Sequence, residues 1–178
     1  MPNKDKRNPM IASKPTLFIF SGLPASGKSS LAKGLVAHLA ASYLRIDTIE
    51  QGLRDLLDCD VVEQGYLLSH RIAAENLQAG QHVVCDSCNP LEVTRRGWEQ
   101  IAVDNDVPYI NIEVTCSDEA EHQRRINQRD VSVAGLTLPN WPEIQQREYH
   151  AWTVERCVID TAGSTLSKSI SELIETLT

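Results

Sequence analysis

The stretch of sequence that decides the fold runs Gly22-Leu23-Pro24-Ala25-Ser26-Gly27-Lys28-Ser29. It matches the phosphate-binding pattern G-x-x-x-x-G-K-[ST] in full. An apolar run from Thr16 to Phe20 precedes it and is typical of a buried strand, and a helical pattern from Lys28 to Ala41 follows it. The motif therefore lies between a strand and a helix, which is the context that a phosphate loop requires.

Each part of this loop suits a polyphosphate. The glycines let backbone N–H groups point inward, and the N-terminus of the following helix adds a favourable dipole. Lys28 can reach the β- and γ-phosphates, and the Ser29 hydroxyl can ligate magnesium. We therefore expect the residues from Gly22 to Ser30 to bind ATP with Mg²⁺. The alternative is a chance match in an ordinary glycine-rich turn.

The rest of the chain alternates between apolar runs and helical patterns. The predicted strands are residues 16–20, 43–46, 82–85, 109–115 and 156–159. The predicted helices are residues 28–41, 47–57, 64–78, 90–102, 118–129, 143–152 and 167–177. Short apolar strands separated by helices predict an α/β fold, a three-layer α/β/α sandwich around a five-stranded parallel sheet. Ligands of such sheets gather at the carboxyl ends of the strands.

Length and composition indicate one soluble domain. The chain has 178 residues, 42% of them hydrophobic and 23% charged, and no apolar run approaches the ~18 residues of a membrane span. We expect residues 1–15 to form a flexible N-terminal tail and residues 16–178 to form the domain. That tail lacks the apolar stretch of a secretory signal. Five cysteines, an odd number, suit buried thiols in a reducing compartment, so the cytoplasm is the predicted location.

The charge and the cysteines argue against two other kinds of site. Seventeen basic residues against 24 acidic ones give a net charge of −7, so no general attraction to nucleic acid is expected, although a local basic groove remains open. Cys85 and Cys88 have C-x-x-C spacing, but a structural zinc site needs a second pair. Cys85 is therefore interpreted as a core strand residue.

Two classes of nucleotide hydrolase fit the sequence poorly. A GTPase needs a base-reading N-K-x-D, which is absent, and the D-x-x-G at residues 160–163 comes too late for a switch. That segment either borders the adenine or is a plain turn before the last helix. A motor-type ATPase usually places a glutamate after the acidic end of its third strand, and none follows Asp86. A phosphotransferase remains the leading class.

Two aspartates end neighbouring predicted strands. Asp86 faces the phosphate loop across the sheet, where it can hold Mg²⁺ directly or through water, or orient the acceptor. Asp47 lies at the next carboxyl end, where it can accept the proton of an acceptor hydroxyl. Both could instead be helix caps.

Arg124, Arg125 and Arg129 occupy a charged helix that precedes a loop rich in glycine and proline, residues 130–142. Arg125 and Arg129 share one helix face. We interpret helix and loop as a small lid that closes over ATP and neutralises charge on the transferring group, with Arg125 binding the nucleotide. A solvated basic helix face is the alternative, and which of the three is the catalytic arginine stays open.

Five segments resemble the AAA_33 type of P-loop kinases: GLPASGKSS, RIDTIE, VVCDSCNPLEVTRRGW, EHQRRINQR and LPNWPEIQQREYHAW. Their order is similar to that in the 5′-hydroxyl kinase domain of polynucleotide kinase, and the second also resembles chloramphenicol phosphotransferase. The resemblance spans residues 17–161. It implies a nucleoside-monophosphate-kinase-like fold, with ATP and Mg²⁺ as cofactors.

The resemblance also implies roles for single residues. Asp47 would be the catalytic base and Arg129 the lid arginine, and Asp86 with Asn89 would match a D-x-x-N segment that contacts metal and acceptor. Together with Lys28 of the phosphate loop, Asp47 and Arg129 are the predicted catalytic residues. One departure matters: Glu50 stands where the polynucleotide kinase pattern has an arginine that grips a substrate phosphate.

The leading hypothesis is an ATP-dependent kinase that phosphorylates a hydroxyl group of a small molecule. A 5′-hydroxyl nucleic acid kinase is a disfavoured alternative, and an ATP-binding regulatory protein with little turnover is another. No membrane partner is expected, and the oligomeric state is left open. Four side chains are candidates for the acceptor pocket: Arg54, Glu63, Tyr66 and Arg71.

Overall fold

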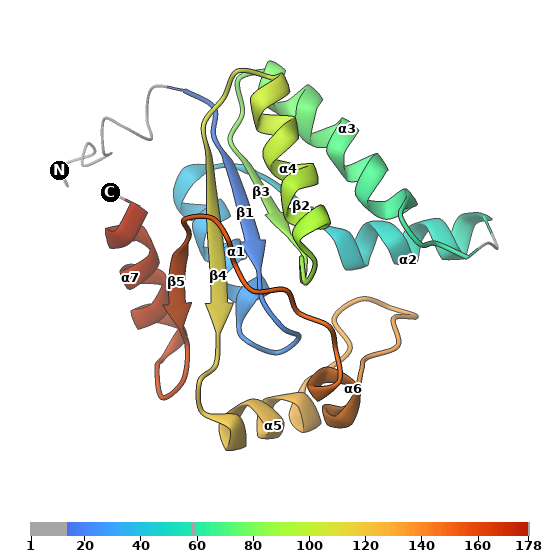
Figure 1. Ribbon diagram of the computed structural model, residues 1–178, viewed down its shortest axis with the longest axis vertical. Helices are drawn as coiled ribbons and strands as arrows, with labels where there is room; N and C mark the ends of the chain where they lie inside the picture. The colour runs from blue at the N-terminus through green and yellow to red at the C-terminus, as the bar shows by residue number, and fades with distance from the viewer. Residues whose placement is uncertain (1–13, 58–59, 178) are drawn as a thin grey trace, which may run out of the picture.

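The computed structural model describes residues 14–57 and 60–177, so most of the predicted tail, residues 1–15, lies outside the described residues. The strands are β1 (Leu17–Ser21), β2 (Ser42–Arg45), β3 (Val83–Asp86), β4 (Tyr109–Thr115) and β5 (Cys157–Asp160). The helices are α1 (Lys28–Leu39), α2 (Ile46–Leu57), α3 (Gln64–Gln78), α4 (Glu92–Asp104), α5 (Glu119–Gln128), α6 (Trp141–Gln145) and α7 (Leu166–Leu177). Figure 1 shows their arrangement.

The strands form one parallel sheet in the order β2-β3-β1-β4-β5. The central strand β1 pairs with β3 on one side and with β4 on the other. All carboxyl ends therefore lie at one edge of the sheet, and α5 and α6 lie beyond that edge (Figure 1). The predicted five-stranded parallel sheet is confirmed.

Helices cover both faces of the sheet. Successive side chains of β1 point to opposite faces, and both sets are apolar, so each face needs a layer of helices to bury it. Phe18 and Phe20 pack into a core with α1 and α7, whereas Leu17 and Ile19 pack into a second core with α3 and α4. All four side chains have no exposed surface. The predicted three-layer sandwich is therefore confirmed as well.

The segment before β5 differs from its prediction. A helix was expected over residues 143–152, but α6 ends at Gln145. The N-terminus of α6 is well defined, because Asn140 and Glu143 form a capping box. Beyond α6 the chain packs next to the start of α4 instead. The His150 N–H donates to the carbonyl of Pro90, two residues before α4, at 2.8 Å. Hydrogen bonds of His150 to Pro90, Glu92 and Arg95 take the place of the helix that the local pattern favoured.

The start of α4 was also placed too early. Pro90 was expected to open this helix, but α4 begins at Glu92. Asn89 has a left-handed backbone with φ of 43°, and its side chain donates to the Phe20 carbonyl at 2.9 Å. This bond ties the segment after β3 to β1 and delays the helix.

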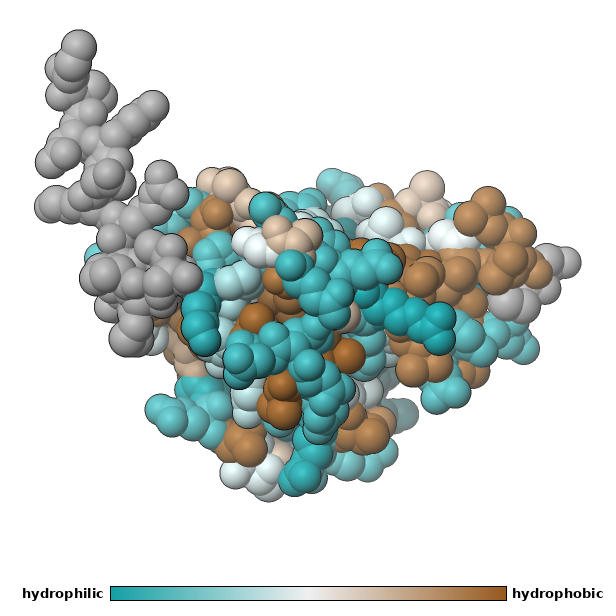
Figure 2. All heavy atoms as spheres, turned by 90° about the horizontal axis from the view of Figure 1, so that it is seen from above, coloured by the Kyte–Doolittle hydropathy of each residue, from teal (hydrophilic) through white to brown (hydrophobic). Residues whose placement is uncertain are grey.

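Helices α2 and α3 extend beyond the sheet. Large hydrophobic side chains are exposed near their junction, among them Leu56, Leu57 and Val62, and Figure 2 shows hydrophobic surface at this end of the molecule. None of the described helices is long and apolar enough to cross a membrane.

Candidate active site

The phosphate loop has the backbone that its glycines permit. Gly22 has a φ of 139°, and a Cβ atom there would lie 2.2 Å from the carbonyl oxygen of Val114. Gly27 has a φ of 97° and precedes the first residue of α1. Only glycine fits the close approach at Gly22, because the neighbouring atom belongs to the backbone.

Three other segments hold the loop in place. The Gly22 N–H donates to the carbonyl of Cys88 at 3.1 Å, which links the loop to the segment after β3. The Thr161 hydroxyl after β5 donates to the Ser26 carbonyl at 2.7 Å. His122 of α5 places its Nε2 atom 2.8 Å from the carbonyl oxygen of Pro24. These three contacts fix the backbone of the loop.

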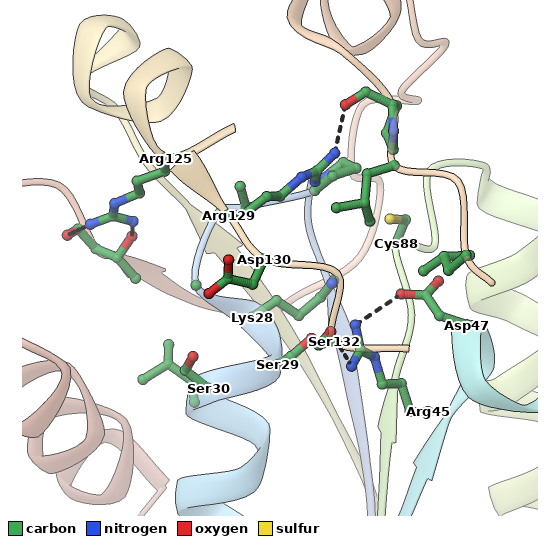
Figure 3. Close-up of a pocket in the computed structure, with 18 of the residues that line it drawn as sticks. Lys28, Ser29, Ser30, Arg45, Asp47, Cys88, Arg125, Arg129, Asp130 and Ser132 are labelled. Atoms are coloured by element: carbon green, nitrogen blue, oxygen red, sulfur yellow. Dashed lines mark hydrogen bonds and ion pairs between the residues drawn. The ribbon is translucent and has the colours of Figure 1, made fainter. Parts of the chain in front are cut away.

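A cavity of about 810 Å³ opens at the carboxyl ends of the strands, above the phosphate loop (Figure 3). It is bounded by the N-terminus of α1, by α2, by the lid residues 129–139 and by the segment after β5. The predicted site residues that line it are Pro24, Ala25, Gly27, Lys28, Ser29, Ser30, Asp47, Arg125 and Arg129. Four predicted site residues are not among the lining residues: Gly22, Leu23, Ser26 and Asp86.

Lys28 and Asp86 form a buried ion pair at the floor of the cavity. The Lys28 Nζ atom lies 3.3 Å from Asp86 Oδ1, and both side chains are almost fully buried. Tyr43 donates its hydroxyl to Asp86 Oδ2 at 2.6 Å, and Arg45 Nε lies 3.9 Å from the same oxygen. Burial alone would raise the pKa of Asp86, but Lys28 and these neighbours hold it below its ordinary value of 3.8. The carboxylate is therefore ionised.

The donors near Lys28 fit Mg²⁺ bound together with phosphate. Mg²⁺ prefers hard oxygen ligands and is usually held by one or two protein groups plus water and substrate phosphates. Ser29 supplies a hydroxyl on the cavity wall. Asp86 supplies a buried Oδ1 whose neighbour among the described residues is the Lys28 ammonium at 3.3 Å, a contact that does not meet hydrogen-bond geometry. Among residues 14–57 and 60–177, no cluster of three or more His, Cys, Asp or Glu side chains could hold a metal.

Asp47 lies in the first turn of α2, with its side chain 42% exposed to the cavity. Arg45 Nη2 lies 3.3 Å from Asp47 Oδ2, and Arg45 Nη1 donates to the Ser132 hydroxyl at 2.9 Å. Arg45 thus joins the predicted base to the lid. Figure 3 shows Asp47 and Arg45 on the side of the cavity opposite Arg125.

The three lid arginines have different surroundings. Arg124 is exposed and does not line the cavity. Arg125 donates to the hydroxyl of Thr161 at 2.7 Å and to its carbonyl at 2.9 Å, which places it beside the end of β5. Arg129 donates to the Pro139 carbonyl and lies nearer the centre of the cavity (Figure 3). Burial lowers the pKa of Arg129 below its ordinary value.

The AAA_33 family, described as an AAA domain, matches residues 17–139. This chain belongs to the AAA_33 family. None of the curated proteins matches it.

Solved structures share the fold of this AAA_33 chain at low sequence identity. A protein from Chloroflexus aurantiacus superposes with a TM-score of 0.69 at 18% identity, covering 93% of this chain and 97% of that one. The APS kinase CysC of Mycobacterium tuberculosis, in complex with AMPPNP and APS, gives 0.65 at 17%, covering 92% and 98%. A gluconokinase from Sinorhizobium meliloti gives 0.59 at 15%, covering 92% and 95%. The fold is that of P-loop kinases.

Some residues expected in the acceptor pocket of this AAA_33 chain lie elsewhere. Arg54 lines the cavity, but Glu63, Tyr66 and Arg71 do not. Tyr66 packs near Trp98 of α4 instead. The helical pattern of α3 could not reveal that Tyr66 packs toward α4 rather than lining the cavity. Asn89, expected to contact metal and acceptor, is fully buried in its bond to β1.

Sequence reasoning missed several lining residues of this AAA_33 chain. The lid contributes Asp130 and Ser132, and Arg45, Cys88 and Arg147 line the cavity as well. Arg45 could have been found, because it ends β2 two residues before Asp47. Arg147 stood in a segment that was predicted to be helical, where no signal distinguished it from a surface arginine.

Proposed function

We propose that this AAA_33 protein is a kinase that transfers the γ-phosphate of Mg·ATP to a hydroxyl group of a small molecule. The observation that supports it best is that Lys28, Asp47 and Arg129, from three separate segments, line one cavity. A protein that only binds a nucleotide needs no carboxylate opposite the phosphates. The names of the similar structures, an APS kinase and a gluconokinase, agree with a small acceptor.

The phosphate loop would hold the nucleotide. Backbone N–H groups at the N-terminus of α1 favour the negative phosphates. Lys28 would exchange part of its contact with Asp86 for the β- and γ-phosphates. Ser29 and Asp86 would hold Mg²⁺, which when bound offsets negative charge on the phosphates. Arg125 and the segment after β5 would border the adenosine, because they line the cavity beyond the loop.

The reaction needs positioning more than covalent chemistry. The acceptor hydroxyl oxygen would form a bond to the γ-phosphorus while the bond from that phosphorus to the bridging β-oxygen breaks, releasing ADP. The hydroxyl proton would pass to the Asp47 carboxylate and then to solvent. Arg45 orients Asp47 through the 3.3 Å contact, and Arg129 would neutralise charge on the transferring group.

The test is ADP release from Mg·ATP, with and without pooled metabolite alcohols or a 5′-hydroxyl oligonucleotide. We expect one metabolite pool to stimulate release. Asp47→Asn should lower kcat by about 10²- to 10⁴-fold while ATP affinity is unchanged, because general base catalysis contributes about that much. Lys28→Ala should abolish the stimulation.

The arginines supply a matched pair for the same assay. Arg129→Ala should lower kcat strongly, whereas Arg124→Ala should not, since Arg124 is exposed and does not line the cavity. Stimulation by the oligonucleotide alone would favour the nucleic acid kinase. ATP binding without stimulated turnover by any acceptor would contradict the proposal and favour a nucleotide-gated regulator.

A further inference from the structure

The cavity is basic although the whole chain is acidic. The net charge of the chain is −7, yet six basic and only three acidic side chains line the cavity. The basic ones are Lys28, Arg45, Arg54, Arg125, Arg129 and Arg147. An excess of positive charge in one hollow attracts anions.

Most of these charges already have a partner or a role. Arg45 is paired with Asp47, and Arg54 lies 3.2 Å from Glu50. Lys28, Arg125 and Arg129 have roles at the nucleotide or the transferring phosphate in the proposed function. Of the six basic side chains that line the cavity, one has neither an acidic partner nor a role in the proposed function.

That side chain is Arg147. Its guanidinium makes no hydrogen bond or ion pair that the described residues show, and it lines the cavity. Its charge acts on Cys88 and Arg129, and the charge of Asp47 acts on the same two groups. Arg147 lines the same cavity as Asp47, and Cys88, on which both charges act, lies with Asp47 on the side of the cavity opposite Arg125 (Figure 3).

The segment that carries Arg147 is firmly anchored. His150, three residues later, donates its N–H to the Pro90 carbonyl at 2.8 Å and accepts a bond from Arg95 Nη2 at 2.9 Å on its own carbonyl. Tyr149 donates to Glu113 at 3.0 Å. A guanidinium on a fixed backbone loses less freedom on binding than one on a loose loop, so it suits selective recognition.

We propose that the acceptor carries an oxyanion, a carboxylate, sulfate or phosphate, which Arg147 binds while the acceptor hydroxyl lies at Asp47. This inference rests on the proposed kinase function. A guanidinium presents paired N–H donors that match the two oxygens of such a group. A site built for a charged group also rejects the neutral analogue, because the arginine would then lose its partner. Arg147 is thus assigned to acceptor specificity rather than to the transfer step.

The first experiment compares matched acceptors in the ADP-release assay: sugar acids against neutral sugars, and alcohol phosphates or sulfates against the parent diols. We expect turnover with anionic members only. Arg147→Ala should raise the KM of the acceptor, lowering kcat/KM by about 100-fold, with the KM of ATP unchanged. Arg147→Lys should restore part of the loss, and Arg124→Ala, an arginine outside the cavity, should behave as wild type.

The second experiment measures anion binding without turnover. With the phosphate loop filled by a non-hydrolysable ATP analogue and Mg²⁺, the Tm is recorded in sulfate, phosphate, acetate or chloride at one ionic strength. We expect an oxyanion to raise the Tm of wild type and of Arg124→Ala above the chloride value, but not that of Arg147→Ala. The most effective anion indicates the chemistry of the acceptor group.

The outcomes separate the two proposals. Equal use of neutral and anionic acceptors, with no effect of Arg147→Ala, would overturn the oxyanion inference and leave the kinase standing. Equal Tm shifts in Arg147→Ala and wild type would overturn it too. Anion binding that depends on Arg147, but without turnover of any acceptor, would keep the anion site and overturn the kinase function.

Discussion

At the scale of single residues, the buried pair of Lys28 and Asp86 links stability to nucleotide binding. The carboxylate is 2% exposed, so its charge is tolerated only because Lys28, Tyr43 and Arg45 surround it. In the proposed function, phosphates that draw Lys28 away would leave Arg45 and a bound magnesium ion to offset the charge of Asp86. The pair therefore keeps Asp86 ionised although it is buried, so removing Lys28 would leave an uncompensated buried charge.

We predict that Lys28→Ala lowers the free energy of unfolding by about 3 kcal/mol at pH 7, because it leaves Asp86 buried without its closest cation. In wild type the pKa of Asp86 is lowered, so its contribution is present above pH 3.8 and is lost as the pH falls further. Without Lys28 that pKa rises. The deficit of the variant should therefore be largest at pH 7 and shrink toward pH 4.

Urea unfolding of wild type and Lys28→Ala at both pH values measures this deficit. The double variant Lys28→Ala with Asp86→Asn is the control, because it removes both charges and should recover part of the loss at pH 7. The ion pair would not be the cause if the loss in free energy of unfolding of Lys28→Ala did not change with pH. It would not be the cause either if the double variant were less stable than the sum of the losses of the two single variants predicts.

At the scale of elements, the phosphate loop is determined by its neighbours as much as by its own motif. Cys88, His122 and Thr161, each from a different segment, hold the backbone of the loop at the distances given above. The lid is joined to α2 in the same way, through Arg45 and Ser132. The elements that line the cavity are thus assembled by contacts between segments rather than by each segment alone.

We predict that Gly22→Ala abolishes nucleotide binding and destabilises the protein, since its Cβ would lie 2.2 Å from a backbone oxygen of β4. Gly52→Ala is the matched control. A Cβ at Gly52 of α2 meets no described atom within 4 Å, so the helix should gain about 0.5–1 kcal/mol. Thermal unfolding and equilibrium binding of an ATP analogue measure both effects. Normal ATP binding by Gly22→Ala would show that the loop tolerates a different backbone.

At the scale of the whole molecule, the C-terminal helix completes the sandwich. The AAA_33 match ends at residue 139, but α7 lies beyond it and buries Leu173 in the core cluster with α1. Near the junction of α2 and α3, in contrast, Leu56 exposes 83% of its surface to solvent. Stability therefore depends on residues that the family match does not include.

We predict that Leu173→Ala lowers the free energy of unfolding by about 2–5 kcal/mol, because it leaves a cavity in the core. Leu56→Ala removes the same atoms from an exposed position and should change it by less than about 0.5 kcal/mol. Both values come from urea unfolding of the full chain. Similar losses in the two variants would contradict the packing of α7 against the sheet.

Most of the confirmed predictions rest on patterns of residues that are contiguous in the sequence. The parallel sheet follows from short apolar runs separated by helices, and the phosphate loop is one unbroken motif whose residues are fixed relative to one another. Asp47 and Arg129 could be placed at the cavity because each lies at the end of a predicted element, although their roles remain predictions. Local order in the chain was enough wherever neighbouring residues define the geometry.

The structure decided what depends on contacts between distant segments. The helix predicted over residues 143–152 gives way to an anchored segment because His150 bonds to Pro90, and that change brings Arg147 to the cavity. Tyr66 turns toward α4, because the rotation of a helix is set by packing and not by its own pattern. The sequence by itself therefore determined the fold and the phosphate loop, whereas only tertiary structure decided which other side chains face the cavity, since long-range hydrogen bonds and packing set their directions.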